Sequence, residues 1–365
     1  MFFSISDKKD TRFINHEKIG NFIVSHDNGW QKTNENTLFK GYKTPNIDHG
    51  NWCEITLTEN NDIFVDHDKN RSFPLWWDED NKILTNLLGN GDSIWADKKV
   101  IINNDLEVDF LSHDPIGEIE FSEISLDKFN HWIVEELINK SKEIVSTYND
   151  FHFFYFNSRG VDTGLISALV CSQGLPATEV SGEYFEIDEF CSVNIDKIQN
   201  SHWAYKQIHH WKSPCFLMTG GCGDEFWFRG PYLIGLWAAW HDVNLIDLLK
   251  CSSGYHVGYF LKEKNTKIFK ELFSKRQEIR ERYPKYEDLI FQILNVNVND
   301  HQHWHLGNTI TWTPYKDIEI TKNILRLPFD TLIEQILKAK VNFGVIDLIY
   351  PEISRKILKT KNDYR

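Results

Sequence analysis

The chain changes its hydrophobic pattern near Pro115. Up to that point, short runs rich in β-branched and aromatic residues alternate with turns of Asn, Asp and Gly, as in NFIVSHDNG and NWCEITLTENNDIFVDHD. The segment ITLTENNDIFV places two such runs around Glu59-Asn60-Asn61-Asp62, which is typical of a β-hairpin. The pattern predicts an antiparallel, β-rich structure for this part of the chain.

Helical spacing begins in the segment SLDKFNHWIVEELINKSKEIVSTY, where Ser125 or Asp127 is available as the N-cap. Apolar side chains recur there on one helical face: Phe129, Trp132, Ile133, Leu137, Ile138 and Ile144. A strand over residues 151–156, a polar turn and a helix over residues 164–172 follow, and this order is typical of a parallel α/β layer. We therefore expect two domains with a boundary near residues 115–124: an antiparallel β domain over 1–118 and an α/β domain over 119–365.

Composition and charge narrow the classes of partner. The chain has 365 residues, of which 41% are hydrophobic and 14% aromatic, so it can bury a substantial core. Its formal charge is −13, from 40 basic and 53 acidic residues, and without a block of Lys or Arg this disfavours a nucleic-acid partner. The six cysteines include no CxxC pair, and the opening MFFSISDKKDTRF lacks the apolar region of a signal peptide. These features favour a cytoplasmic protein with reduced thiols and no membrane partner.

The turn NSRGVDTG, residues 157–164, follows the first predicted strand of the α/β layer and is suited to an anion; we call it the first turn. Where a parallel strand ends and a helix begins, free backbone N–H groups and the positive end of the helix dipole come together. Ser158 and Thr163 add hydroxyl donors, Gly160 lets the backbone bend or approach closely, and Asp162 can hold a Mg²⁺ that bridges phosphates. A polar strand-to-helix turn without any ligand is the alternative.

A second turn, residues 219–225 (TGGCGDE), follows the short apolar strand in CFLMTGGCGDEFWFRGPY and ends on Asp224 and Glu225. Two carboxylate turns at neighbouring strand ends would form a site for a divalent cation that carries a polyphosphate. A tight glycine turn with no ligand is the alternative here.

Both segments resemble motifs of the asparagine synthetase and β-lactam synthetase family, which belongs to the superfamily of PP-loop ATP pyrophosphatases. The string SRGVDT is similar to the PP-loop S-G-G-x-D-S, and residues 219–232 are similar to S-G-x-G-x-D-E-x-F-x-G-Y. Three weaker similarities extend the match along the chain. DHDKNRSFPLWW resembles the R-D-x-x-G-x-x-P-L-Y-Y hairpin, TWTPYKDIEITKNILRLP resembles the R-x-P-F-L-D segment, and ISRKILK resembles the K-x-I-L-R element.

The resemblance implies a degenerate Ntn-hydrolase-like, glutaminase-like β domain followed by a PP-loop α/β domain with a parallel sheet and helices. It implies a ligase that uses ATP and Mg²⁺ to adenylate a substrate carboxylate, releases pyrophosphate, and transfers the acyl group to an amine. Asp162 and Asp224 would hold the metal, Lys356 or Arg355 would stabilise charge at the carboxyl carbon, and Glu225 is a candidate base. The nucleotide would contact Ser158, Arg159, Gly160, Val161, Asp162, Thr163, Gly220 and Asp224.

Departures from the family pattern keep alternatives open. The chain begins Met1-Phe2-Phe3 where glutamine-dependent members begin Met-Cys, so we expect no glutaminase activity. Arg159 replaces a glycine of the loop, the interval between the two turns is shorter than in typical synthetases, and Trp312 stands where the family has arginine. A non-catalytic scaffold or binding protein, and a PP-loop enzyme that adenylates a different carbonyl substrate, are the alternatives. The sequence identifies neither the carboxylate nor the amine, and it leaves the oligomeric state open, with a homodimer as the candidate.

Overall fold

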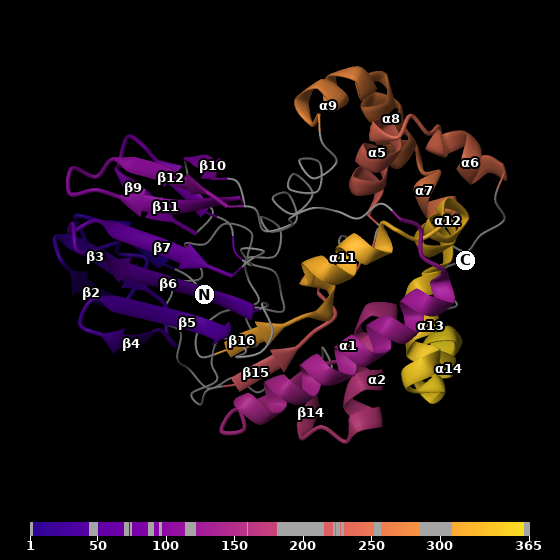
Figure 1. Cartoon of the computed structure of the whole chain (residues 1–365), viewed down its shortest axis with the longest axis horizontal. Coiled ribbons are helices and arrows are strands. Elements are labelled where there is room, and N and C mark those ends of the chain that lie inside the picture. Colours follow the sequence, from indigo (N-terminus) through magenta and orange to yellow (C-terminus); the bar gives the residue numbers. More distant parts are fainter. Residues whose placement is uncertain are drawn as a thin grey trace.

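The computed structural model describes residues 3–43, 50–68, 73, 75–86, 91–94, 97–113, 122–158, 160–180, 215–221, 223, 227, 230–251, 257–284 and 309–360. Antiparallel sheets come first along the chain, and a parallel sheet with helices follows (Figure 1). The expected mixed α/β class is confirmed at this level.

The amino-terminal part contains two antiparallel sheets. In spatial order, the first consists of β10 (Asp92–Ile94), β8 (Leu75–Asp78), β9 (Ile83–Thr85), β1 (Phe3–Ser6), β3 (Phe22–His26) and β2 (Asn15–Ile19). The second consists of β12 (Val108–Ser112), β11 (Lys98–Ile102), β7 (Ile63–His67), β6 (Gly50–Leu57), β5 (Thr37–Lys43) and β4 (Gln31–Asn34). Buried side chains from both sheets form one hydrophobic cluster, so the two sheets pack on each other.

The predicted hairpin is confirmed by β6 and β7. Leu57 pairs with Ile63, and the N–H of Thr58 donates to the carbonyl of Asp62 at 2.8 Å. Asn61 has a φ of 63°, a left-handed conformation that Asn tolerates better than most residues. Burial alternates along β6, which explains how one face of this hairpin enters the core.

The parallel sheet has the spatial order β14 (Ala177–Val180), β13 (His152–Phe156), β15 (Cys215–Met218) and β16 (Thr309–Trp312). Each neighbouring pair in this sheet runs parallel. The prediction of strands before both turns, and of a parallel layer, is therefore confirmed. The inner strand β15 is buried along its whole length, as expected for a short apolar strand in a parallel sheet.

The described helices pack beside this sheet and extend from it on the side away from the β-rich part (Figure 1). They are α1 (Leu126–Thr147), α2 (Val161–Gln173), α5 (Pro231–Trp240), α6 (Leu245–Cys251), α7 (Val257–Phe260), α8 (Glu263–Ser274), α9 (Arg276–Arg282), the 3₁₀ helix η3 (Pro314–Lys316), α11 (Ile318–Ile324), α12 (Phe329–Lys338), α13 (Lys340–Ile349) and α14 (Pro351–Thr360). No helix in these ranges combines the length and the apolar character needed to cross a bilayer.

The start of α1 was predicted well, and the start of α2 was not. Ser125 is the N-cap of α1, where its side chain accepts the N–H of Lys128. The predicted helix over 164–172 begins three residues earlier, at Val161, with Gly160 as its N-cap. The polar residues before 164 favour a turn in the sequence pattern, but Asp and Thr are also suited to the first turn of a helix, where the carboxylate meets the positive end of the dipole.

The β-rich part and the α/β part are in direct contact. The ring of Tyr42, on β5, lies 5.2 Å from that of Phe216 and belongs to the hydrophobic cluster of the α/β part. Asn51 Nδ2 donates to the carbonyl of Thr311 at 2.7 Å, which joins β6 to β16. The hydroxyl of Tyr148 accepts a hydrogen bond from the N–H of Lys43 at 2.9 Å and donates one to the carbonyl of Lys43 at 3.0 Å. The predicted boundary at residues 115–124 falls largely on residues 114–121, which lie outside the described residues.

Candidate functional site

The two glycine-containing turns touch each other. Their preceding strands, β13 and β15, are parallel neighbours, so both turns emerge at the same edge of the sheet. A Cβ added at Gly220 would lie 2.6 Å from the backbone carbon of Asp162, and one added at Gly223 would lie 2.5 Å from the carboxyl carbon of Asp162. Only glycine allows this approach of the second turn to the first.

The hydroxyl groups of the first turn organise its backbone. The N–H of Ser158 donates to Thr163 Oγ1 at 3.2 Å, and the two hydroxyl oxygens lie 3.1 Å apart. Gly160 contributes in two ways: its N–H donates to Ser158 Oγ at 3.3 Å, and its carbonyl accepts from Thr163 Oγ1 at 3.3 Å. Gly160 provides no side-chain cap for α2, so the positive end of this helix faces the turn without a capping acceptor.

The carboxylate of Asp162 is oriented from two sides. It lies against Gly223 of the second turn, and its Oδ1 accepts from Asn342 Nδ2, on α13, at 3.3 Å. Asn342 also donates to the hydroxyl of Tyr315, which in turn donates to the carbonyl of Asp162 at 3.1 Å. Asp162 is half-buried and Asn342 is fully buried, and the contacts with Asn342 and Gly223 fix the direction of this carboxylate.

Sequence reasoning missed Asn342 and the side chain that holds it. Gln335, on α12, is fully buried and donates to Asn342 Oδ1 at 2.7 Å and to the carbonyl of Trp227 at 3.0 Å. Its Oε1 accepts the N–H of Val341 at 2.8 Å. The signal in the sequence was a polar residue on an otherwise apolar helical face, in FDTLIEQILK and in KVNFGVIDLI. A buried amide at such a position needs partners, and here its partners lead to the first turn.

The segment that resembles R-x-P-F-L-D supports the second turn. The N–H of Thr219 donates to the carbonyl of Trp312 at 3.0 Å, and Thr313 Oγ1 donates to the carbonyl of Gly221 at 2.7 Å. The side chain of Trp312 is buried in the core. In the synthetase segment that this stretch resembles, arginine stands at this position. Asp317 caps α11 and forms a buried ion pair with Lys140 of α1.

An acidic side chain missed by the sequence analysis lies beside the first turn. Glu179, on the edge strand β14, accepts the hydroxyl of Tyr155 at 2.6 Å and the amide of Asn157 at 3.1 Å. Burial, and then the bond to this carboxylate, raise the pKa of the Tyr155 hydroxyl well above its usual range. The hydroxyl therefore stays protonated and holds the Glu179 side chain at the carboxyl edge of the sheet.

The predicted residues Arg355 and Lys356 lie on α14, and both are exposed. The next residue, Ile357, is buried against α2: a Cβ added at Gly164 would meet Ile357 Cδ1 at 2.1 Å. Helix α14 therefore packs on the amino-terminal end of α2, beside the first turn.

Three of the predicted site residues, Arg159, Asp224 and Glu225, lie outside the described residues. No group of three or more His, Cys, Asp or Glu side chains that could hold a metal occurs within the described ranges. At the two turns, the described hydrogen-bond donors are the hydroxyls of Ser158 and Thr163 and the amino-terminal N–H groups of α2, and the carboxylate of Asp162 is a possible cation ligand. This donor set fits a polyphosphate with a hard divalent cation, which takes oxygen ligands from carboxylates and phosphates.

No protein-family model matches the sequence, and a comparison with curated proteins finds no match. The geometry of the two turns therefore carries the assignment of function.

Proposed function

We propose that the chain is an ATP-dependent, AMP-forming ligase of the asparagine synthetase and β-lactam synthetase type, which joins a carboxylate to an amine without hydrolysing glutamine. The observation that carries this proposal is the contact between the two turns, in which Gly220 and Gly223 lie against Asp162. It gives a physical reason for glycines in the second turn and brings together, at one edge of the sheet, the two segments that resemble motifs of this family.

Each residue at the turns would have a distinct task. When bound, Mg-ATP would supply the AMP group that activates the carboxylate, with pyrophosphate as the leaving group. The hydroxyls of Ser158 and Thr163 and the amino-terminal N–H groups of α2 would orient the phosphates, because these donors are arranged around one turn. Asp162 together with Asp224 would hold the cation. Such a site works by positioning and by electrostatic stabilisation more than by covalent chemistry.

Helix α14 would supply a positive charge that stabilises the negative charge developing at the reacting carboxyl carbon. Lys356 or Arg355 would supply the cation, and the packing of Ile357 on Gly164 supports this role because it brings α14 close to the first turn. Glu225 is the proposed base for the incoming amine.

The amino-terminal β part would serve as a scaffold. Phe3 is fully buried at the start of β1, and its N–H donates to Asn86 Oδ1 at 2.8 Å. We propose that ammonia or another free amine is used directly, without hydrolysis of glutamine.

Isothermal titration with Mg-ATP, and with AMP plus pyrophosphate, tests the proposal on the full chain. The wild-type chain should bind Mg-ATP, and Asp162→Asn should weaken binding at least about tenfold, since removing a charged ligand costs roughly 1.5–3 kcal/mol. Asp330→Asn is the matched control, because Asp330 is an exposed carboxylate in the first turn of another helix, α12. This control should bind as the wild type does.

The same titration separates the alternatives. Absence of heat with every nucleotide ligand would favour the non-catalytic scaffold. Equal binding by Asp162→Asn and the wild type would remove the first turn from the nucleotide site. Binding of Mg-ATP without amide formation from any carboxylate and amine would favour a PP-loop enzyme of different chemistry.

A further inference from the structure

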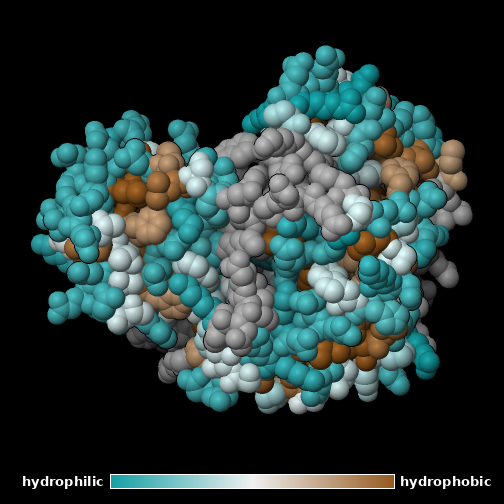
Figure 2. All heavy atoms as spheres, viewed as in Figure 1, coloured by the Kyte–Doolittle hydropathy of each residue, from teal (hydrophilic) through white to brown (hydrophobic). Residues whose placement is uncertain are grey.

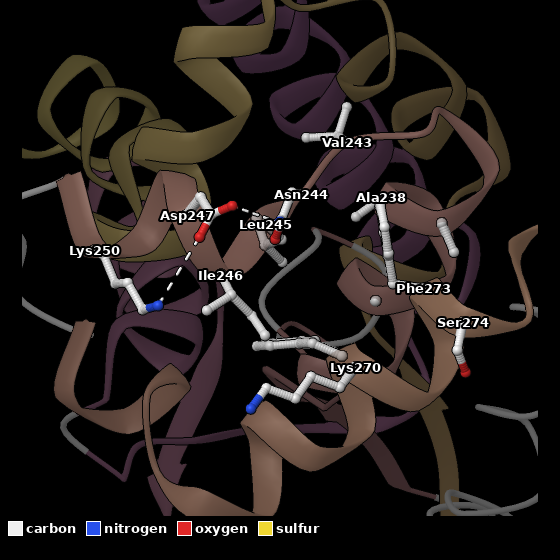
Figure 3. A pocket seen from close by; sticks show the side chains of 13 residues that line it. Ala238, Val243, Asn244, Leu245, Ile246, Asp247, Lys250, Lys270, Phe273 and Ser274 are labelled. Carbon is white, nitrogen blue, oxygen red and sulfur yellow. Dashed lines mark hydrogen bonds and ion pairs between the residues drawn. The ribbon is translucent and has the colours of Figure 1, made fainter.

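A separate pocket of about 250 Å³ lies among helices α5, α6 and α8 (Figure 3). Its lining includes no residue of either turn, so it is distinct from the site proposed above. Most of the side chains that line it are apolar, among them Ala238, Val243, Ile246, Phe269 and Phe273. Figure 2 shows hydrophobic side chains reaching the surface in this region, surrounded by hydrophilic ones.

Small residues on α5 create the pocket. A Cβ added at Gly235 would lie 2.6 Å from Leu272 Cδ1, so Gly235 lets α8 pack closely on α5. One turn further on, Ala238 and Ala239 leave the space between the helices unfilled. The chain then turns at Asp242, which has a φ of 60°, and α6 lines another side of the space. The hollow is therefore formed by the backbone path and by short side chains.

Positive charge predominates at the rim. Lys250 on α6 and Lys270 on α8 line the pocket, and Figure 3 shows their amino groups on the same side of it. The acid at the rim, Asp247, accepts from Asn244 Nδ2 at 2.5 Å and lies 3.9 Å from the Lys250 amine, a long distance for an ion pair. Among the described residues, Lys270 forms no ion pair. Two cations against one anion favour a ligand with a single negative charge.

The size of the pocket sets the size of its ligand. A volume of about 250 Å³ corresponds to roughly eight water molecules at ~30 Å³ each, and it lies just below the range of about 300–1,000 Å³ that is usual for drug-sized ligands. An apolar body of about eight carbon atoms with a charged end has the matching dimensions.

We propose that this pocket binds a small amphiphilic carboxylate. The apolar body packs against Ala238, Ile246 and Phe273, and the carboxylate lies at the rim between Lys250 and Lys270. The lysines are exposed, so their contribution is screened by water and the apolar body supplies most of the affinity. Chain length should therefore matter more than charge.

Thermal unfolding and displacement of a fluorescent anionic probe, measured on the full chain with hexanoate, octanoate and 1-octanol, test the proposal. Each additional buried methylene is worth about fourfold in affinity, so octanoate, with two more methylenes, should bind roughly fifteenfold more tightly than hexanoate. Val243→Trp fills the pocket from a half-buried position, and it should abolish stabilisation by octanoate.

The variant Lys270→Gln measures how much the positive charge of Lys270 contributes to binding of the carboxylate. It should weaken octanoate about two- to fivefold and leave 1-octanol unchanged, as expected for an exposed ion pair. Lys264→Gln is the matched control, since Lys264 is an exposed lysine of the same helix that does not line the pocket. The control should bind octanoate as the wild type does.

Equal binding of octanoate by the wild type and by Val243→Trp would overturn the proposal. So would equal affinities for octanoate and 1-octanol in both the wild type and Lys270→Gln. No arm of this experiment uses ATP, and its outcome is therefore independent of the ligase assignment.

Discussion

At the scale of single residues, glycine determines where the two turns meet. Gly220 and Gly223 approach Asp162 so closely that any side chain would collide with its backbone or its carboxylate. Gly258 and Gly174 have nothing within 4 Å of an added Cβ. The contrast shows that glycine is required for packing at the turns, whereas at Gly258 the structure gives no such reason.

A second residue-scale feature is the buried imidazole of His26. Its Nδ1 lies 2.8 Å from the carbonyl of Asp27, and in the described part of the chain its buried Nε2 has no hydrogen-bond partner. Burial lowers the pKa of this imidazole, although the carbonyl of Asp27 opposes the shift. The folded state therefore resists protonation of His26 more than the unfolded state does.

The pH dependence of unfolding should report this resistance. Between the lowered folded pKa of His26 and the unfolded value of about 6.5, the unfolded chain binds more protons, so stability falls as the pH falls, by at most about 1.4 kcal/mol per pH unit. Urea unfolding between about pH 5 and 8 should show a flatter profile for His26→Gln than for the wild type. His131→Gln, at an exposed position on α1, is the control. Identical slopes in all three chains would show that His26 does not titrate in this range.

At the scale of elements, the sequence predicted the features that depend on neighbouring residues. The hairpin of β6 and β7, the cap at Ser125 and the strands before both turns depend on residues close in sequence, and their signals were readable. The contact of Asn342 with Asp162 joins residues that are far apart in the chain, and no periodicity encodes such a pairing. The strand order β14-β13-β15-β16 likewise results from tertiary packing. The sequence alone therefore did not predict this order.

The packing of α14 on α2 gives a test at this scale. Gly164→Ala would place a methyl group 2.1 Å from Ile357 Cδ1, and we expect a loss of about 1–3 kcal/mol, in spite of the better helix propensity of alanine. Ile357→Val alone should cost about 0.5–1.5 kcal/mol. Because valine lacks the colliding methyl, the double variant should be more stable than the sum of the single losses predicts, by about 0.5 kcal/mol or more. Denaturant unfolding of the four chains measures this, and strict additivity would mean that the helices do not meet as described.

At the scale of the whole molecule, the described chain has two hydrophobic cores that meet at a limited contact. The first core is built from the antiparallel sheets, and the second from the parallel sheet and its helices. Among the residues that the structure describes, Tyr42 extends from β5 into the second core, where burial and nearby carboxylates raise the pKa of its hydroxyl and keep it neutral. Its ring also lies 6.2 Å from that of Tyr148.

Tyr42→Ala should therefore reveal whether the two cores unfold together. Removing a buried aromatic ring costs about 3–5 kcal/mol, and here that loss falls on the contact between the cores. Scanning calorimetry should show one transition for the wild type and two for Tyr42→Ala, because coupling between the cores is what keeps them cooperative. Phe22→Ala is the control, since Phe22 is buried in the first core alone, and it should lower the midpoint of a single transition. A single transition for Tyr42→Ala, with equal calorimetric and van't Hoff enthalpies, would contradict this prediction. The cores would then be coupled through the remaining contacts, such as the hydrogen bond between Asn51 and Thr311. In that case the predicted boundary near residues 115–124 would not separate independent folding units.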